Sequence, residues 1–169
     1  FLTRNGLEPE RLTTAFGYDA EGSVSPDGRF VVFSSNRHAF DEALAPETRE
    51  QLAENPSYFI DLYLLDQESG QIRRLTSAPG YDGGPFFSPD GERIVWRRFS
   101  GAGDRAEIHT IAVDGTDERV LTRLDAMSWA PFYHPSGDYI VFTTNLHGFD
   151  NFELYLVDAE GKSDPVRVT

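Results

Sequence analysis

A short segment built on Ser-Pro-Asp-Gly occurs three times in this chain, and it constrains the fold more than any other feature. The copies are Tyr18–Gly28, Tyr81–Gly91 and Met127–Gly137. Each copy leads directly into a run of β-branched and aromatic residues. Proline presets φ near about −65° for a turn, aspartate bonds back to nearby backbone, and glycine accepts positive φ. The segment therefore predicts a hairpin corner that repeats along the chain.

A Leu-Thr or Val-Thr pair closes each repeat and divides the chain into units. The pairs are Leu12-Thr13, Leu75-Thr76, Leu121-Thr122 and Val168-Thr169. They predict a half unit followed by three full units, with the bounds 1–13, 14–76, 77–122 and 123–169. The half unit is expected to contain the end of one strand, an Asn5-Gly6 hairpin turn and a second strand.

Each full unit contains four predicted strands. The first strand precedes the corner, and the second follows it at once, as in Phe30–Ser34, Ile94–Arg97 and Tyr139–Thr143. The third strand alternates in polarity, and the fourth runs to the Leu-Thr pair. In the first unit an insert at 37–58 separates the second strand from the third, and its segment Ala45–Ala53 predicts one short helix.

Such units predict an all-β fold, because a four-stranded antiparallel sheet cannot bury both of its faces alone. Radial stacking of successive sheets gives a β-propeller of four-stranded antiparallel blades, and a flat solenoid is the alternative. Propellers close with about four to eight blades. This chain is expected to supply three and a half, so its ring is incomplete, and either the remaining blades of a longer chain or a second copy completes it.

The two end blades of such a segment are expected to leave one face each without a neighbour. These faces are expected to carry aromatic side chains of the second strands, such as Phe33, Trp96 and Phe142. A whole apolar blade face is more than a soluble monomer normally exposes. We therefore expect another blade or a second copy to cover it.

Charge and composition exclude several classes of function. The chain has 28 acidic and 15 basic residues, and its formal net charge is −13 at pH 7. This balance disfavours binding to nucleic acid or anionic membranes and favours cations or basic partners. No apolar run approaches the roughly 18 residues of a membrane-spanning helix. The absence of cysteine excludes disulfides and thiol catalysis.

The repeat also resembles a known family. The D-x-x-P-x-F-S-P-D-G run of Asp82–Gly91, the Ile-Val-aromatic strand after it and the closing Arg74–Thr76 are similar to the TolB-like, WD-type β-propeller repeat. The resemblance covers essentially the whole chain outside the insert. The copies also depart from the pattern, since the first has Gly22–Val24 where proline and an aromatic are usual, and the third has His134 at the corner serine.

The resemblance implies a non-catalytic scaffold that binds a protein partner or a peptide, in the periplasm of a bacterium or outside the cell. No enzyme activity and no cofactor are then expected of the chain itself. The alternative is a propeller segment of a larger peptidase, of the prolyl-oligopeptidase or zinc-aminopeptidase type, that docks or filters substrate. The sequence has neither a G-x-S-x-G elbow nor histidines at a familiar zinc spacing.

Four residues are candidates for binding a ligand, namely Asp19, Asp82, Trp129 and His147. Both aspartates follow a tyrosine and precede an innermost strand, so they are expected at one rim near the propeller axis. Their carboxylates suit a basic ligand or a cation such as an axial Ca²⁺, or they accept hydrogen bonds from backbone amides of their own loops. His147 lies in a loop between strands, where it contacts either a ligand or solvent.

Two further segments have structural interpretations. Gly101–Ala106 fits the G-x-G-x-x-A dinucleotide pattern, but an alternating run follows it instead of a helix, which predicts a hairpin loop. Arg97 and Arg98, next to Trp96, form a compact basic cluster. Alternation places one arginine toward the adjacent blade and the other on the opposite face, and an ion pair with a neighbouring carboxylate is expected.

Overall fold

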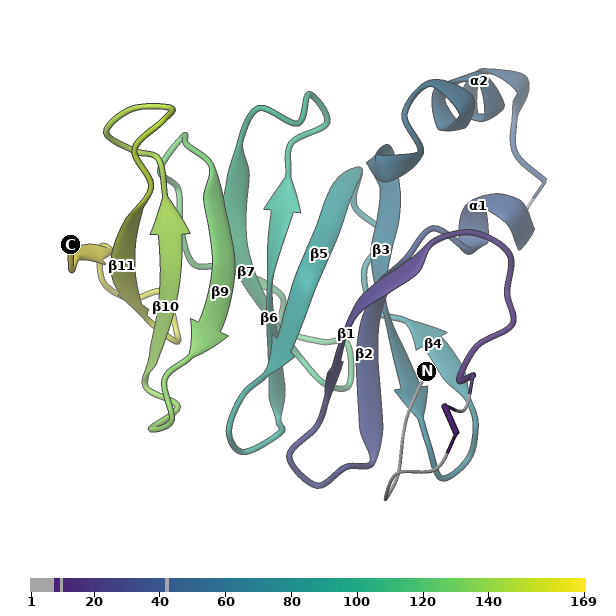
Figure 1. Ribbon diagram of the computed structural model, residues 1–169, viewed down its shortest axis with the longest axis horizontal. Coiled ribbons are helices and arrows are strands. Elements are labelled where there is room, and N and C mark those ends of the chain that lie inside the picture. The colour runs from purple at the N-terminus through teal and green to yellow at the C-terminus, as the bar shows by residue number, and fades with distance from the viewer. Residues whose placement is uncertain (1–7, 10, 42) are drawn as a thin grey trace.

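Three groups of four strands lie side by side in the computed structural model, which describes residues 8, 9, 11–41 and 43–169 (Figure 1). We call each group a sheet, although the first two are joined into one eight-stranded sheet. The first sheet contains β1 (Asp19–Val24), β2 (Phe30–Ser35), β3 (Phe59–Asp66) and β4 (Ile72–Arg74). The second contains β5 (Gly80–Phe87), β6 (Arg93–Phe99), β7 (Ala106–Ala112) and β8 (Arg119–Val120). The third contains β9 (Ser128–Tyr133), β10 (Tyr139–Thr144), β11 (Glu153–Asp158) and β12 (Val166–Arg167).

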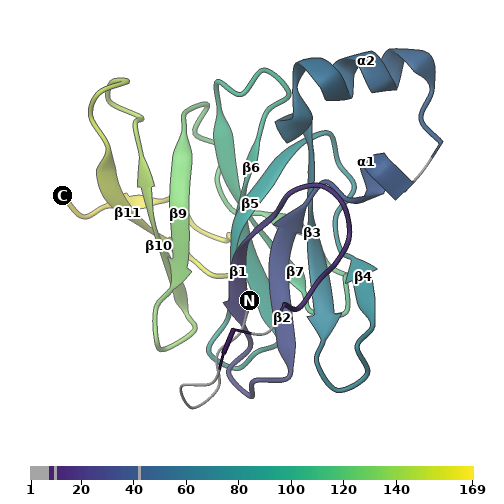
Figure 2. The same cartoon turned by 45° about the vertical axis from the view of Figure 1, so that its right-hand side comes forward.

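Strand order in each sheet follows the sequence, and the neighbours within a sheet are antiparallel. A short parallel pairing, Phe59 with Gly80 and Ile60 with Tyr81, joins the first sheet to the second. Figures 1 and 2 show the third sheet at one end of the row and β2 to β4 at the other, so the described sheets do not close on themselves. The prediction of β-propeller blades in an incomplete ring is confirmed.

The predicted hairpin corners join the first strand of each sheet to the second. In the first two corners a serine hydroxyl accepts the N–H that begins the next strand, from Phe30 to Ser25 at 2.8 Å and from Arg93 to Ser88 at 2.9 Å. In the third corner His134 takes the place of serine, and its Nδ1 accepts the N–H of Ser136 at 3.2 Å. The ring nitrogen is also an acceptor, but it bonds within the turn instead of to the first N–H of the next strand.

The threonine of each Leu-Thr or Val-Thr pair makes the same hydrogen bond in all three sheets. The threonine hydroxyl accepts a backbone N–H from the third strand of the same sheet, at 2.9 Å in all three sheets. The donors are Leu62, Ile108 and Leu154. Threonine thus extends the pairing of the third strand beyond the short fourth strand, which explains why the pair recurs.

A β-bulge interrupts each innermost strand, β1, β5 and β9, at the same position of the repeat. One residue of each bulge has left-handed backbone, and these residues are Glu21 (φ 54°), Gly84 (φ 61°) and Ala130 (φ 49°). Glycine adopts this conformation without strain, whereas glutamate and alanine do not. A bulge changes the direction of a side chain relative to the regular alternation of a strand. The Glu21 side chain therefore does not point where regular alternation would place it.

The core of the described chain contains two apolar layers between adjacent sheets and a third cluster on the outer face of the first sheet. The layer between the first and second sheets includes Val32, Leu62, Leu64, Ile94, Trp96 and Ile111. The layer between the second and third includes Val95, Ile108, Ile140, Phe142, Tyr155 and Val157. Side-chain alternation along the strands supplies both layers, as in β6, where Ile94 and Val95 belong to different layers.

The prediction that Trp96 and Phe142 lie on open faces is wrong. Their side chains are 0% and 1% exposed because strand alternation turns both of them into the layers between sheets. Phe33 does lie on the outer face of the first sheet, but it is only 5% exposed, packed with Tyr63 and next to Leu12. The outer face of the third sheet carries Tyr139, Val141, Leu154, Leu156, Val166 and Val168.

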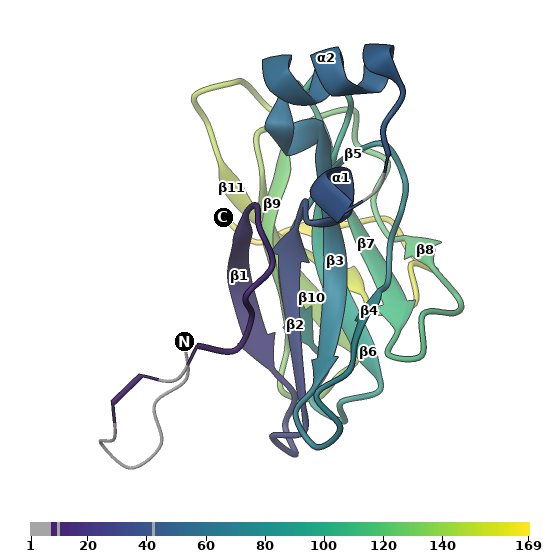
Figure 3. The ribbon, with the colours of Figure 1, turned by 90° about the vertical axis from the view of Figure 1, so that its right-hand side faces the viewer.

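The insert contains the predicted helix and two additional elements. They are α1 (His38–Asp41), α2 (Pro46–Glu54) and the short 3₁₀ helix η1 (Pro56–Tyr58). No residue of α2 is buried, and Figure 3 shows α2 across one end of the sheets. Arg37 and Ala39 are buried, however, so the insert begins inside the blade. No helix in the described ranges is long and apolar enough to cross a membrane.

The predicted half blade lies largely outside the described residues, which omit 1–7 and 10. Its described end, 11–13, is not part of a strand. Leu12 in this segment packs against the apolar outer face of the first sheet.

Candidate functional site

The four predicted site residues lie at the end of the sheets where β1, β5 and β9 begin (Figure 1). Asp19 and Asp82 are in β1 and β5, Trp129 is in β9, and His147 is in the loop between β10 and β11. Helix α2 and the loop after β6 are at the same end. This rim therefore gathers loops from all three sheets.

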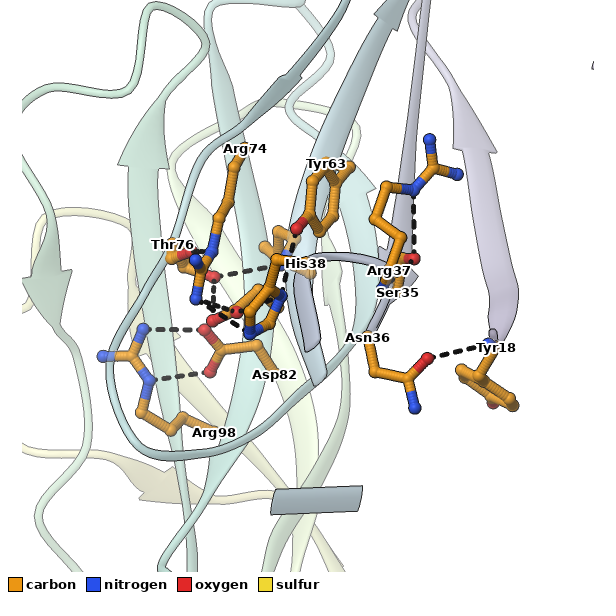
Figure 4. Close-up of polar contacts among 12 residues, drawn as sticks. Tyr18, Ser35, Asn36, Arg37, His38, Tyr63, Arg74, Thr76, Asp82 and Arg98 are labelled. Atoms are coloured by element: carbon orange, nitrogen blue, oxygen red, sulfur yellow. Dashed lines mark hydrogen bonds and ion pairs between the residues drawn. The ribbon is translucent and has the colours of Figure 1, made fainter. Parts of the chain in front are cut away.

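Asp82 forms a buried ion pair with Arg98. Its carboxylate is fully buried and accepts from Arg98 Nε at 2.6 Å and from Nη2 at 2.8 Å (Figure 4). Arg98 Nη1 also donates to Glu118 at 2.5 Å, and Glu118 contacts the His109 ring at 3.2 Å. The hydrogen bond from His109 and those from Arg98 lower the pKa of Glu118 to about 2, against burial. Asp82 thus shares the Arg98 guanidinium with a second carboxylate, Glu118.

Asp19 has an equivalent partner. Arg37 Nη2 lies 2.8 Å from both Asp19 carboxylate oxygens, and the Thr13 hydroxyl donates to Asp19 at 2.5 Å. Burial raises the pKa of Asp19, but hydrogen bonds from Ser35, Thr13 and Arg37 outweigh it and leave the pKa lowered. Guanidinium groups are therefore the principal partners of both aspartates, rather than backbone amides of their own loops.

The third sheet has no such ion pair at the equivalent place. Ser128 stands where the first two copies have aspartate, and it pairs in register with Thr144. Both hydroxyls are buried without a hydrogen-bond partner among the described residues. Within these residues, no group of three or more histidine or acidic side chains is arranged to hold a metal ion.

A second buried network attaches α1 to the first sheet. Asp61, 2% exposed, accepts from Arg74 Nη2 at 2.5 Å and lies 3.3 Å from His38 Nδ1. Arg74 also contacts His38 Nε2 at 3.2 Å, and because guanidinium can only donate, this ring nitrogen must accept (Figure 4). Burial raises the pKa of Asp61 to about 7, although Arg74 opposes the shift. Sequence reasoning missed this carboxylate because nothing in its local pattern distinguishes it from a strand residue facing solvent.

Arg97 is surrounded by a carboxylate and three aromatic rings at the rim. It points to the opposite side of β6 from Arg98, as alternation predicts, and its Nη2 donates to Glu21 Oε1 at 2.8 Å. The predicted ion pairs of both arginines are thus confirmed. The Arg97 guanidinium lies over three rings, with centroid distances of 5.5 Å to Tyr81, 5.8 Å to Phe99 and 5.9 Å to Trp129.

Glu21 links the first sheet to the second. Its Oε2 accepts the Tyr81 hydroxyl at 2.5 Å and the Gly84 N–H at 2.8 Å. Burial raises the pKa of Glu21, but hydrogen bonds from Tyr81 and Arg97 outweigh it and leave the pKa lowered. A Cβ at position 84 would lie 2.1 Å from Arg97 Nη1, so a larger residue there would displace the guanidinium. Aligning the copies of the repeat could have identified this site, because the first copy has the charged Glu21 at the position where the second copy has Gly84.

An open pocket of about 350 Å³ lies beside Arg97. Its walls come from β5, β6, β9, the loop after β6 and the insert, and they include Tyr81, Arg97, Phe99, Gly101, Trp129 and Tyr58. Trp129 is 42% exposed. Asn55 and Ser57 add polar groups from the insert. The pocket therefore offers aromatic rings, a neutralised guanidinium and hydrogen-bonding side chains.

Of the other predicted segments, the one at His147 does not contribute to the pocket and the 100–105 loop does. His147 is not in the pocket wall, and its Nε2 lies 2.8 Å from the Tyr155 hydroxyl. The 100–105 segment is the predicted hairpin loop, closed by the Ser100 N–H to Arg105 carbonyl bond at 2.9 Å. It contributes to the pocket as a wall rather than as a phosphate-binding turn.

Comparison with known proteins supports a TolB-like β-propeller fold. No protein-family model matches the chain. An uncharacterized protein of Agrobacterium fabrum, Atu1656, is 29% identical over 141 residues, which are 68% of this chain and 47% of that protein. The chain thus spans about half the length of this relative.

Solved TolB structures have the same fold. A TolB candidate from Agrobacterium tumefaciens is 26% identical, with a TM-score of 0.66 over 92% of this chain and 50% of that one. TolB from Acinetobacter baumannii is 18% identical, with a TM-score of 0.67 over 95% of this chain and 34% of that one. A puromycin-hydrolyzing peptidase of Mycobacterium tuberculosis also matches, at 18% identity, a TM-score of 0.62 and 89% and 22% coverage.

Proposed function

We propose that this chain is part of a non-catalytic β-propeller scaffold that binds a protein partner or a peptide at its pocketed rim. The observation that carries the proposal is the pocket beside Arg97, in which Trp129 is 42% exposed. The other two copies of the repeat have Ala20 and Gly83 at this position. The blade therefore does not need a tryptophan there for packing, and partially exposed aromatics are typical of binding sites.

The charge of the chain and its likeness to TolB support the rest of the proposal. A net charge of −13 favours a basic partner and disfavours nucleic acid. We infer a bacterial cell envelope location, periplasmic or secreted, and repeats of the WD type, from the resemblance of the repeat and the TolB structures that share the fold. Asp19 and Asp82 are assigned a structural role, because arginines already neutralise them. The proposal requires no axial cation.

A second candidate function is a propeller segment of a larger peptidase that docks or filters substrate. It is favoured by the shared fold of the Mycobacterium tuberculosis peptidase, of which this chain covers 22%. The same rim pocket would then contact the substrate before cleavage. Similarity at 18% identity carries only the fold, so this candidate comes second.

The two candidates predict different outcomes when the full chain, immobilised, is exposed to a bacterial envelope extract. A scaffold retains a protein partner in unmodified form, and mass spectrometry of the eluate then shows intact termini. A substrate-docking segment instead retains peptides that the parent enzyme cleaves. Retention of nothing above the level of an unrelated acidic β-propeller would contradict the scaffold.

A further inference from the structure

Four aromatic side chains form a continuous row across the rim, which we call the aromatic row: Tyr81, Phe99, Trp129 and Phe152. Neighbouring ring centroids are 5.7, 5.9 and 5.8 Å apart. Trp129 and Phe152 are 42% and 43% exposed, so the row emerges from the pocket onto the surface. It joins the second sheet to the third and ends at the start of β11.

The geometry of the aromatic row suits another aromatic ring. Phe99 and Trp129 meet at 67°, so one ring presents its edge toward the face of the other beside the pocket. Aromatic pairs prefer edge-to-face or offset arrangements with centroids about 4.5–7 Å apart. A ring entering the pocket of about 350 Å³ can extend this pattern with Trp129 and with Tyr58 of the insert wall.

The charge of the pocket excludes an acidic ligand as the best occupant. The Arg97 guanidinium is already paired with Glu21 at 2.8 Å, so the pair is close to neutral. The Arg97 side chain, which is 16% exposed, lines the pocket, whereas its Nε is buried out of reach of a ligand. A carbonyl oxygen can supply an acceptor without bringing a second negative charge next to Glu21, whereas a carboxylate cannot.

The surroundings of the pocket favour positive charge on the segments that flank the ring. Exposed carboxylates of Asp104 and Asp150 belong to the two loops next to the aromatic row, and Asp104 also lies 3.8 Å from Arg105 Nε of its own loop. The chain as a whole carries −13. Attraction of this kind acts over about a Debye length, roughly 8–10 Å in ordinary buffers, and weakens with added salt.

We propose that the pocket binds an aromatic side chain of a peptide segment whose neighbouring residues are basic. The ring packs against Trp129 and Phe99, and a backbone carbonyl of the segment accepts from Arg97. This inference rests on the proposed scaffold function and names the chemistry of its partner.

The test is a titration of the full chain with a short fluorescently labelled peptide that carries one phenylalanine between lysines and arginines, followed by anisotropy. Two comparison peptides replace the phenylalanine by alanine or the basic residues by glutamate. We expect each replacement to weaken binding at least about tenfold, the usual loss for a well-packed anchor. We also expect the affinity of the phenylalanine peptide to fall as salt rises.

Variants of the chain locate the binding. Trp129→Ala should weaken the phenylalanine peptide at least about tenfold, and Ser57→Arg, an exposed change in the insert wall, should weaken it by adding bulk and positive charge. Tyr139→Ala is the matched control, because Tyr139 is 49% exposed but lies on the outer face of the third sheet. Its affinity should equal that of the unchanged chain.

Several outcomes would overturn the inference. Equal binding of the phenylalanine and alanine peptides would show that charge attraction alone holds the peptide. Unchanged affinity of both Trp129→Ala and Ser57→Arg for the phenylalanine peptide would show that it binds outside this pocket. Undetectable binding of every peptide would also contradict it. If an envelope protein is retained equally by the unchanged chain and by Trp129→Ala, the scaffold function stands and only this inference fails.

Discussion

At the scale of single residues, the paired aspartates of the repeat are structural anchors. Asp82→Ala should lower the free energy of unfolding by about 3 kcal/mol, because it leaves the half-buried Arg98 without its two-pronged partner. Asp114→Ala should cost much less, since Asp114 is an exposed turn residue whose side chain bonds to Thr116 at 2.9 and 2.6 Å, and its carbonyl, which accepts from Arg73, is retained in alanine. Urea denaturation of both variants checks the difference, and equal midpoints would contradict the assigned role of Asp82.

The raised pKa of Asp61 should make the folded chain less stable as the pH rises from about 4 to 7. Its pKa is about 7 in the folded chain and about 3.9 when unfolded, so between these values the folded state binds the extra proton. Stability from this group is therefore greatest below about pH 4 and falls as the pH rises toward 7. The lowered pKa values of Asp19 and Glu21 act in the opposite direction, but only at pH values near and below their unfolded pKa of about 4.

Melting temperatures measured from pH 5 to 7.5 test this sign. The unchanged chain should lose thermal stability across this range, and Asp61→Asn should show a flatter profile because the titrating group is gone. An equally steep profile in Asp61→Asn would show that a group other than Asp61 titrates.

At the scale of elements, the insert separates into a packed start, an exposed helix and a pocket wall. Arg37 and Ala39 are buried, whereas α2 buries no residue. Replacing 43–53 by a short Gly-Asn linker should therefore change stability by less than about 1 kcal/mol. Circular dichroism and a thermal melt check this expectation. Removal of 37–39 as well should be far more damaging, and aggregation of the shorter deletion would show that α2 packs against something essential.

At the scale of the whole molecule, the outer face of the third sheet remains apolar and uncovered. Tyr139, Leu154, Val166 and Val168 on this face are 39–65% exposed. We expect the 169-residue chain to self-associate through this face. Tyr139→Lys with Leu154→Lys should shift light scattering toward the monomer, and Phe149→Ser, in the exposed loop before β11, should not. A monodisperse monomer of the unchanged chain would contradict the expectation.

The sequence by itself determined the blades. Turn chemistry at Ser-Pro-Asp-Gly and the β-type runs after it are local properties, and their repetition leaves few architectures besides stacked four-stranded sheets. The helix at Pro46–Glu54 could also be predicted, because proline and glutamate mark its start within a few residues. The candidate rim was predicted through Asp19, Asp82 and Trp129 for the same reason, since each occupies a fixed position in a repeat.

Only the tertiary structure decided which groups meet at that rim. Glu21 reaches Arg97 from another sheet, and Asp61 reaches His38 across the start of the insert. Such partners depend on how sheets stack and on the direction that a bulge gives to a side chain, and neither is encoded in local spacing. The same reason explains the error over Trp96 and Phe142, because period-two alternation gives two faces but does not say which face has a neighbour.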